Sequence, residues 1–288
     1  MSRSKRKFRL LVIVAVCLAA FAYRSFPTDS FDGLTVTFVD VGQGDSVFIK
    51  APNGKTMLLD CGEEETFYSL LKPFLMSEGV RTLDALVASH YHSDHVGAAD
   101  DIFETFGVKS LVVPDYEPKN KTKKGLLSAA RKENAEVVSV SEGALLPEID
   151  PNLKIAALHP AKGGFSDNEN ENSLVLKLEY FGTTILLTGD IEQAAEEKIA
   201  RMYEIETDIL KVAHHGSSTS SCAEFLQEAD PTYAIIQCGE DNSYGHPHHE
   251  TMSALEDEDV RIYRTDTDGN IVFRLSERGI ESIKTSRF

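Results

Sequence analysis

The sequence has little cysteine, little positive charge and no long apolar run. Its four cysteines, Cys17, Cys61, Cys222 and Cys238, are scattered without CxxC spacing, so no disulfide framework is implied and small buried hydrophobes are expected. The longest apolar run, 10–23, has 14 residues, fewer than the roughly 20 of a full membrane span. The 288 residues are 42% hydrophobic, which allows a substantial core and excludes general disorder.

The charge is unevenly distributed along the chain. Residues 1–26 hold six basic residues and no acidic one, so the formal net charge of −17 becomes −23 for residues 27–288. A body this acidic repels polyanions at long range. Phosphate contacts dominate nucleic-acid binding, so a DNA substrate would need bound metals or a local basic patch.

The N-terminal residues have the pattern of a targeting segment. Five basic residues precede the apolar run 10–23, and the small residues Ala20 and Ala22 allow cleavage before Tyr23. We therefore expect residues 1–26 to be a signal peptide or, if uncleaved, a membrane anchor. The positive flank predicts an extracytoplasmic place for the rest of the chain, with a linker at 27–33 and one domain at 34–288.

The apolar pattern predicts alternating strands and helices. Expected strands are 35–41, 46–50, 56–60, 83–89, 110–113, 153–158, 173–180, 184–188 and 209–213, and expected helices are 66–78, 96–106, 126–134 and 192–203. Each half of the chain reads as a hairpin, an aspartate, a helix, a strand and a histidine, which suggests an internal duplication. This pattern predicts α/β layers with mixed sheets and a ligand site at one shared edge.

The strongest chemical signal is the HxHxDH cluster formed by His90, His92, Asp94 and His95, which follows a buried strand. Three imidazoles and a carboxylate suit zinc, iron or manganese, and they are hard to explain as packing. In an extended loop His90 and His92 point the same way. Asp94 and His95 can then turn toward a second ion.

Two later segments carry similar residues. Asp190 follows Gly189 at the end of a strand, and its two oxygens could bridge two ions; a helix cap is the alternative. His214 and His215 follow another buried strand, so one can bind metal while the other faces substrate. Surface histidines are the alternative here, although Gly216 and the serines after it can turn backbone N–H groups toward an anion.

Three further features are weaker. His159 ends a strand and is a candidate metal ligand, and His246 is a candidate for contact with the substrate or the transition state. The turn 40–45 is bracketed by glycines. It is at least as well explained by a tight connection between strands, with carboxylates that accept hydrogen bonds from nearby loops, as by a functional role. His248 and His249 are expected to be solvated at the start of a helix.

Taken together, these motifs resemble the metallo-β-lactamase superfamily, and more closely the hydrolase domain of the ComEC competence family, from about Phe38 to Phe273. The motifs are Phe38-Val39-Asp40-Val41-Gly42-Gln43-Gly44-Asp45-Ser46, Leu59-Asp60-Cys61-Gly62, 89–95, Asn172-Ser173-Leu174-Val175-Leu176, Leu187-Thr188-Gly189-Asp190, 210–217, Tyr244-Gly245-His246-Pro247 and Tyr263-Arg264-Thr265-Asp266. The resemblance implies a four-layer αββα sandwich with two divalent ions, zinc or manganese, at one sheet edge.

The resemblance also implies a role for each candidate residue. One ion takes His90, His92 and His159; the other takes Asp94, His95 and His215; Asp190 bridges them; Asp60 orients the loop ligands; His214 and His246 contact the substrate. We expect Asp94, His214 and His246 to be the catalytic side chains. The match supplies no membrane channel, so DNA import by this chain alone is not expected.

The expected reaction is hydrolysis by a hydroxide held between the two ions. Attack on phosphorus would make the protein a phosphodiesterase or nuclease acting on extracellular DNA. The acidic body leaves a cell-wall or small phosphodiester open, and attack on carbon would make it an ester or lactone hydrolase. A non-catalytic binding module is disfavoured because all seven candidate ligand positions are filled. No protein partner is predicted.

Overall fold

The computed structural model describes residues 31–119 and 121–287, and the chain divides into two units, 1–32 and 33–288. The apolar run 10–23 and most of the expected linker lie outside the described residues. Within the two described ranges, no helix is long and apolar enough to cross a membrane. All strands and the described helices belong to the second unit.

The first sheet has eight strands in the order β14-β13-β1-β2-β3-β4-β5-β6. Their bounds are β1 Leu34–Phe38, β2 Val47–Lys50, β3 Thr56–Leu59, β4 Thr82–Val87, β5 Gly107–Pro114, β6 Glu136–Val140, β13 Asn270–Ser276 and β14 Gly279–Ser286. Pairing is antiparallel from β14 to β3 and parallel from β3 to β6. The sheet is therefore mixed, as expected.

The second sheet has six strands in the order β12-β11-β10-β9-β8-β7. Their bounds are β7 Leu153–His159, β8 Val175–Tyr180, β9 Thr183–Leu187, β10 Ile209–Lys211, β11 Tyr233–Ile236 and β12 Arg261–Arg264. Pairing is antiparallel from β7 to β9 and parallel from β9 to β12. Both sheets thus contain a hairpin whose second strand starts a parallel run, which is the plan that the two halves of the sequence share.

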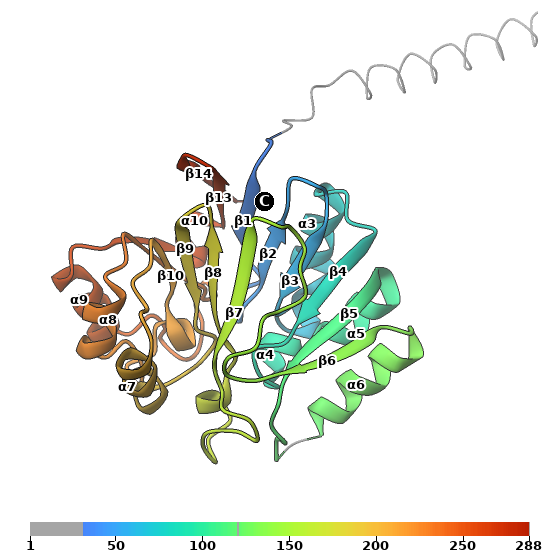
Figure 1. Ribbon diagram of the computed structural model, residues 1–288, viewed down its shortest axis with the longest axis horizontal. Coiled ribbons are helices and arrows are strands. Elements are labelled where there is room, and N and C mark those ends of the chain that lie inside the picture. The colour runs from blue at the N-terminus through green and yellow to red at the C-terminus, as the bar shows by residue number, and fades with distance from the viewer. Residues whose placement is uncertain (1–30, 120, 288) are drawn as a thin grey trace, which may run out of the picture. The chain divides into compact units, whose positions relative to one another are not determined.

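Helices cover the outer face of each sheet (Figure 1). Around the first sheet they are α2 Glu64–Thr66, η1 Phe67–Leu71, α3 Lys72–Ser77, α4 Ser93–Val96, α5 Ala99–Thr105 and α6 Thr122–Lys132. Around the second they are η2 Asn170–Asn172, α7 Gln193–Met202, η3 Ala213–Gly216, α8 Ala223–Ala229, α9 His249–Asp257 and α10 Thr265–Asp268.

Three apolar clusters define the layers. The central one packs the two sheets face to face and includes Phe38, Leu187 and Phe273. A second cluster joins α3, α5 and α6 to the first sheet, and a third joins α7, α8 and α9 to the second. The resulting order is helices, sheet, sheet, helices. Strands buried on both faces have nearly continuous apolar sequences, as β4 does from Leu83 onward apart from Asp84.

The expected helix 66–78 is divided in the structure. A π-helical turn, η1, separates α2 from α3, and Pro73 lies in the first turn of α3. Proline is tolerated there because the first N–H groups of a helix have no intrahelical partner. The chain therefore continues through Pro73 instead of ending the helix before it.

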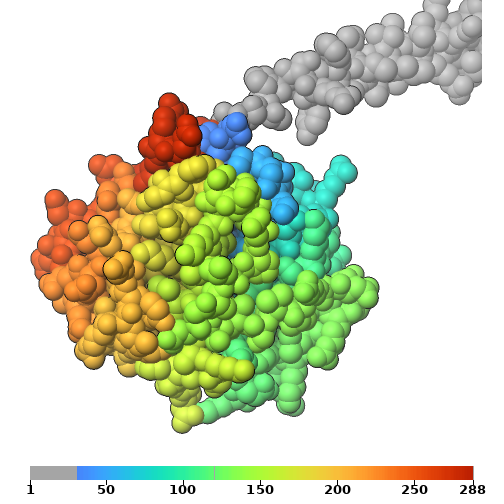
Figure 2. All heavy atoms as spheres, viewed as in Figure 1, coloured from blue at the N-terminus to red at the C-terminus, as the bar shows by residue number. Residues whose placement is uncertain are grey.

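The carboxyl ends of β4, β9 and β10 bring three loops to one edge of the sandwich. Those loops carry the HxHxDH cluster, Asp190 and the His214-His215 pair. The loops after β5 and after β7 meet nearby, where Lys119 Nζ lies 3.4 Å from Asp167 Oδ1. In Figure 2 these two loops project together at the lower margin of the molecule.

Candidate metal centre

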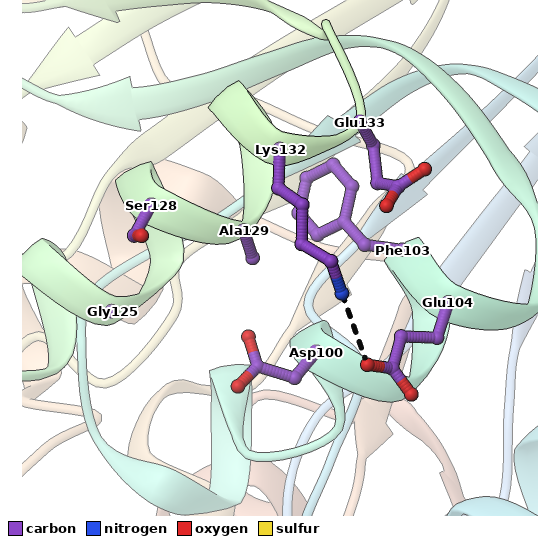
Figure 3. A pocket seen from close by; sticks show the side chains of 8 residues that line it. All are labelled: Asp100, Phe103, Glu104, Gly125, Ser128, Ala129, Lys132 and Glu133. Carbon is purple, nitrogen blue, oxygen red and sulfur yellow. Dashed lines mark hydrogen bonds and ion pairs between the residues drawn. The ribbon is translucent and has the colours of Figure 1, made fainter.

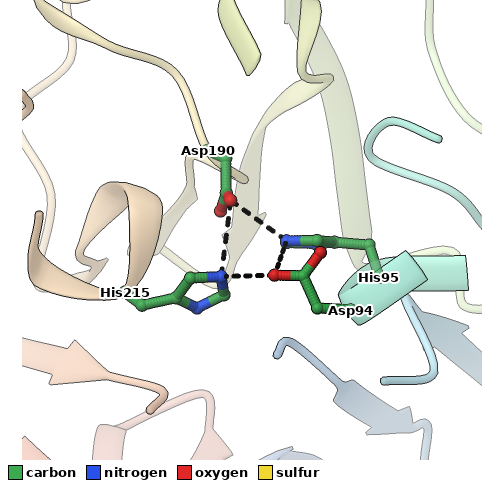
Figure 4. A group of neighbouring side chains, drawn as sticks. All are labelled: Asp94, His95, Asp190 and His215. Carbon is green, nitrogen blue, oxygen red and sulfur yellow. Dashed lines mark hydrogen bonds and ion pairs between the residues drawn. The ribbon is translucent and has the colours of Figure 1, made fainter. Parts of the chain in front are cut away.

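Four side chains from both halves of the chain converge at this edge. The ligand atoms of Asp94, His95, Asp190 and His215 all lie within 4.8 Å of one another (Figure 4). The Nε2 atom of His95 is 3.2 Å from Asp190 Oδ2. The Nε2 atom of His215 is 3.2 Å from Asp94 Oδ2 and 3.4 Å from Asp190 Oδ2. Two imidazoles and two carboxylates facing one point are a suitable ligand set for a divalent ion.

The position of Asp94 is set by close contacts between its backbone and the turn 40–45. Asp45 N donates to Asp94 O at 3.1 Å, and the neighbouring Gly44 has φ +125°. A Cβ atom on Gly44 would lie 2.2 Å from Asp94 O, which no side chain tolerates. The glycines of the turn 40–45 thus allow two loops to touch, and the turn is part of the site.

The loop after β10 adopts an uncommon backbone conformation. His214 and His215 have φ values of 51° and 55°, in a region that residues other than glycine seldom adopt. His214 N donates to Gly189 O at 3.1 Å, which ties this loop to the one carrying Asp190. Strain of this kind persists where surrounding contacts impose it, and it concentrates at functional sites.

Asp60 contacts His95 on the side away from the cluster. Its Oδ2 atom lies 2.9 Å from His95 Nδ1 and accepts the Ser89 hydroxyl at 2.6 Å, while Oδ1 accepts Ser89 N at 2.7 Å. An Nδ1 atom held in this way leaves Nε2 directed at Asp190. Carboxylates behind a ligand histidine fix its ring orientation and tautomer.

Sequence reasoning missed a buried ion pair beside the cluster. The ammonium group of Lys211, at the end of β10, lies against the Asp45 carboxylate, and the two side chains are 2% and 3% exposed. Lys211 Nζ also donates to Gly189 O at 3.0 Å, and Asp45 Oδ1 is 3.3 Å from His215 Nδ1. The available signal was a single lysine in an otherwise apolar strand directly before two histidines.

Positive charge stabilises the buried carboxylates of the cluster. Burial disfavours imidazolium, but Asp190 and the neighbouring carboxylates outweigh it and raise the pKa of His95 and His215 well above the usual value. Burial likewise opposes ionisation of Asp190, yet His215 and His95 hold its pKa well below the usual value. Without a metal, protons on the histidines therefore supply the charge that a cation would bring.

The remaining predicted ligands lie around this cluster. The ring centroid of buried His90 is 4.1 Å from that of His95 and 4.7 Å from that of His92, whose side chain is 41% exposed. His159 is buried, and its Nε2 donates to Glu171 O at 2.7 Å. Burial lowers the pKa of His159 to about 4 and that of His90 well below the usual value, so both rings are neutral at pH 7.

These three histidines do not form a converging group with one another. Among residues 31–119 and 121–287, the ligand groups within 4.8 Å are the one above and a second made of Asp45, Asp60 and His95. His90 Nε2 and His159 Nδ1 are nevertheless buried with no hydrogen-bond partner among those residues. A neutral, buried imidazole nitrogen without a partner fits a metal ligand, so the chemistry of both side chains agrees with the predicted role.

The cluster opens into a cavity of about 290 Å³. Its lining consists of Gln43, His92, Ser93, Asp94, Asn170, Asp190, His214, His215, Tyr244 and His246. Burial, together with His215, His214 and His248, lowers the pKa of His246 to about 4. The His246 ring is therefore neutral at pH 7 and able to hydrogen-bond a substrate oxygen without carrying charge.

A second hollow, of about 270 Å³, lies between α5 and α6 (Figure 3). It is lined by Asp100, Phe103, Glu104, Gly125, Ser128, Ala129, Lys132 and Glu133, and Lys132 Nζ reaches Glu104 Oε1 at 3.4 Å. None of the candidate ligands lines it. Of these two hollows, only the cavity over the histidine cluster is lined by candidate ligands.

Comparison with known proteins shows the family to which the chain belongs. A family profile described as "Metallo-beta-lactamase superfamily" matches residues 39–240. The chain is 35% identical to "ComE operon protein 3" of Bacillus subtilis over 96% of its own length and 38% of that protein. It is 29% identical to "Competence protein ComA" of Neisseria gonorrhoeae over 86% of its own length and 33% of that protein. The chain thus spans about a third of the length of these relatives.

Solved structures share the fold at low sequence identity. The metallo-beta-lactamase fold protein YhfI from Bacillus subtilis superposes with a TM-score of 0.56 at 15% identity, covering 84% of this chain and 99% of that one. Zn²⁺-bound PqqB from Methylobacterium extorquens superposes with a TM-score of 0.52 at 10% identity, covering 84% of this chain and 100% of that one.

Proposed function

Because the chain belongs to the metallo-β-lactamase superfamily of hydrolases, we propose that it is a two-metal phosphodiesterase whose substrate is DNA. The observation that carries the proposal is the group of Asp94, His95, Asp190 and His215 at the base of an open cavity. Divalent ions held there would activate a water molecule and neutralise charge on a phosphoryl group. Either zinc or manganese suits the mixed nitrogen and oxygen ligands.

The proposal assigns the two ion positions to named side chains. Asp94, His95 and His215 would hold one ion, His90, His92 and His159 would hold the other, and Asp190 would be a ligand of both. Asp190 has one oxygen, Oδ2, facing His95 and His215, while Oδ1 is buried with no hydrogen-bond partner among the described residues. Supporting the second position are the unpartnered nitrogens of His90 and His159.

Residues around the cavity bind and orient the substrate. His246, neutral at pH 7, donates a hydrogen bond to a phosphoryl oxygen, and this bond strengthens as negative charge develops in the transition state. His214 lines the same cavity, with its Nε2 3.3 Å from Asn170 Nδ2 and its Nδ1 3.1 Å from Thr219 Oγ1. These contacts hold the His214 ring at the cavity wall, where it contacts the substrate.

Two observations support DNA as the substrate. One of the relatives named above is a competence protein by name, and the resemblance to the ComEC competence family implies DNA as the substrate. This acidic chain also has four lysines close together, Lys119 and Lys121 just before α6 and Lys123 and Lys124 in its first turn, of which Lys119 pairs with Asp167 and Lys123 with Glu117. The ammonium group of Lys123 is 5.7 Å from the ring centroid of Tyr91, which lies between His90 and His92.

The proposal includes an extracytoplasmic place for residues 34–288, with residues 1–26 as signal peptide or anchor. It is supported by the five basic residues before the apolar run. Protease treatment of intact cells tests it. Digestion of the domain without lysis is expected, and protection until lysis would contradict the proposed location.

Turnover by the purified chain tests the chemistry. The substrates are single-stranded DNA, double-stranded DNA, bis-p-nitrophenyl phosphate and p-nitrophenyl acetate, each with Zn²⁺ or Mn²⁺, and Asp190→Ala is the inactive control. DNA cleavage that the control lacks supports the proposal. Cleavage of the small diester alone favours the second candidate, a cell-wall or small-molecule phosphodiesterase, which the net charge of −23 on residues 27–288 also favours. Turnover of the acetate alone indicates an ester or lactone hydrolase.

A further inference from the structure

A column of three rings leads from the metal centre to the surface. The His246 ring stacks on His215, with centroids 6.0 Å apart and planes 30° apart. The Tyr244 ring stacks on His246, with centroids 5.5 Å apart and planes 18° apart. Tyr244 is 64% exposed and lines the same cavity as Asp94 and Asp190. The outermost ring thus stands beside the place where a scissile phosphate would bind.

The loop that carries Tyr244 is fixed by its own hydrogen bonds. Asn242 Nδ2 donates to Gly239 O at 3.0 Å and to His246 O at 2.7 Å, and His246 N donates to Asn242 Oδ1 at 3.0 Å. On the other side, His248 Nε2 donates to Tyr244 O at 3.1 Å, while His248 Nδ1 accepts Ser218 N at 2.9 Å. The backbone at Tyr244 is therefore held in place before any ligand arrives.

The exposed ring is not explained by packing or by a polar contact. Only one face of Tyr244 is covered, by His246, and the hydroxyl has no hydrogen bond to another described residue. A large ring that is exposed to water and nearly parallel to a ring beneath it has the geometry of a stacking platform. Every nucleobase has a π-face that can extend such a column.

We propose that Tyr244 stacks on the base of the nucleotide next to the scissile phosphate, so that the substrate class is single-stranded nucleic acid. The inference rests on the proposed phosphodiesterase function. A nucleotide places its base one sugar away from its phosphate, which matches a platform at the wall of the cavity that holds the metal ligands. Bases inside a duplex are already stacked on their neighbours, so a duplex cannot use this platform without unpairing.

A quaternary ammonium group, such as choline, is the competing ligand for an aromatic face. Proteins that recognise such cations surround them with several rings. At this site Tyr244 offers one open face, and the ring next to it, His246, continues the same stack instead of forming a second wall. A flat ligand that adds one more layer fits this arrangement better than a round cation does.

Binding of two short strands tests the inference. The metal-loaded full chain is titrated with a fluorescent decathymidylate and with an equally long strand that lacks all bases, both with phosphorothioate linkages that resist hydrolysis. The variants are Tyr244→Ala and Tyr244→Phe. Tyr68→Ala is the matched control, because Tyr68 is 62% exposed on η1 and donates its hydroxyl hydrogen bond to Asp101.

The expected result is a loss that depends on the bases. Tyr244→Ala should weaken decathymidylate binding by about 5- to 150-fold, the range for one stacked base, and leave the abasic strand within about twofold. Tyr244→Phe and Tyr68→Ala should bind both strands as the unmodified chain does. An equal loss for both strands, or no loss, overturns the inference.

Cleavage of unmodified strands separates this inference from the function on which it rests. If Tyr244→Ala shows the base-dependent loss of binding but the unmodified chain hydrolyses no strand, the stacking platform is supported and the phosphodiesterase proposal fails. If the unmodified chain cuts both strands and Tyr244→Ala binds and cuts them equally well, the enzyme proposal stands and the platform is overturned.

Discussion

The Lys211 ammonium group and the Asp45 carboxylate form an ion pair that is almost entirely shielded from water. Removing two charges from water costs several kcal/mol for each ion, and their attraction offsets this cost only with good geometry and further hydrogen bonds. Both conditions hold, because Lys211 also donates to Gly189 O and Asp45 also faces His215. Lys211 therefore balances one of the negative charges crowded around the metal centre.

Lys211→Met should strongly destabilise the metal-free protein. The substitution leaves the Asp45 carboxylate buried without its partner, which costs about 3–5 kcal/mol. Lys109→Met is the control, because Lys109 pairs with Asp84 at 2.6 Å but is 65% exposed, and about 0–1 kcal/mol is expected there. Urea unfolding measures both free energies. Similar values for the two variants would contradict the importance of the buried pair.

Asp60→Asn should weaken metal binding without removing a metal ligand. The amide disturbs the contact with His95 Nδ1, and changes at such positions reduce metal affinity or activity about 10- to 100-fold. Isothermal titration with Zn²⁺ measures the affinity. Asp167→Asn, on a side chain that is almost fully exposed, provides the comparison and should titrate like the unmodified protein. An unchanged Zn²⁺ affinity for Asp60→Asn would show that Asp60 does not orient His95 for metal binding.

Gly44→Ala should damage the metal centre more than a matched glycine substitution elsewhere. Gly44 and Gly54 both have positive φ, so an alanine at either position is strained by about 1–3 kcal/mol. Only at Gly44 does the added Cβ meet the Asp94 carbonyl, whereas nothing lies within 4 Å of it at Gly54. Metal affinity should fall for Gly44→Ala and stay unchanged for Gly54→Ala. Equal affinities would show that the loop moves freely.

His246→Ala should reduce turnover while the bound metal is retained. His246 is not in either converging ligand group, and loss of one donor to developing charge lowers kcat by about 10²- to 10³-fold. Metal content by atomic absorption and kcat for bis-p-nitrophenyl phosphate are measured together. His249→Ala, on an exposed side chain of α9, should change neither quantity. Loss of metal from the His246→Ala variant would show that His246 is a metal ligand instead.

The metal-free protein should lose stability as the solution becomes alkaline. The pKa of His95 and of His215 is raised in the folded state above the unfolded value of about 6.5. Their contribution is fully present below pH 6.5 and is lost as the pH rises through the folded pKa. Urea midpoints at several pH values from 6 upward, with metal removed by chelation, measure this. A flat profile would contradict the raised pKa values, and bound metal should abolish the decline.

Several parts of the fold could be predicted from local patterns. The strand before His90 is a nearly continuous apolar run, and the hairpins carry clear turn residues at Asn53-Gly54 and Phe181-Gly182. Strand β6 was missed because most of its residues are exposed at the sheet edge, so its alternation is weak. Strands β11 to β14 and helix α8 were also not expected.

Some residues of the site could likewise be predicted from the sequence, and others could not. The HxHxDH cluster, Asp190 and His215 stand out because their residue types are hard to explain as packing. The ion pair of Lys211 and Asp45 could not be predicted, because it depends on how closely the two sheets approach at one edge. The column ending at Tyr244 depends likewise on ring orientations that only the folded loop determines. Predictions for His90, His92 and His159 as ligands stay predictions.

The converging ligand group draws Asp94 and His95 from one half of the chain and Asp190 and His215 from the other. During synthesis, the first half leaves the ribosome long before His215 does. A nascent chain therefore cannot assemble this ion site until translation has passed the second sheet's central strands and both sheets have packed. An ion held by all four side chains therefore requires both halves of the chain, so it would bind only to a completed molecule.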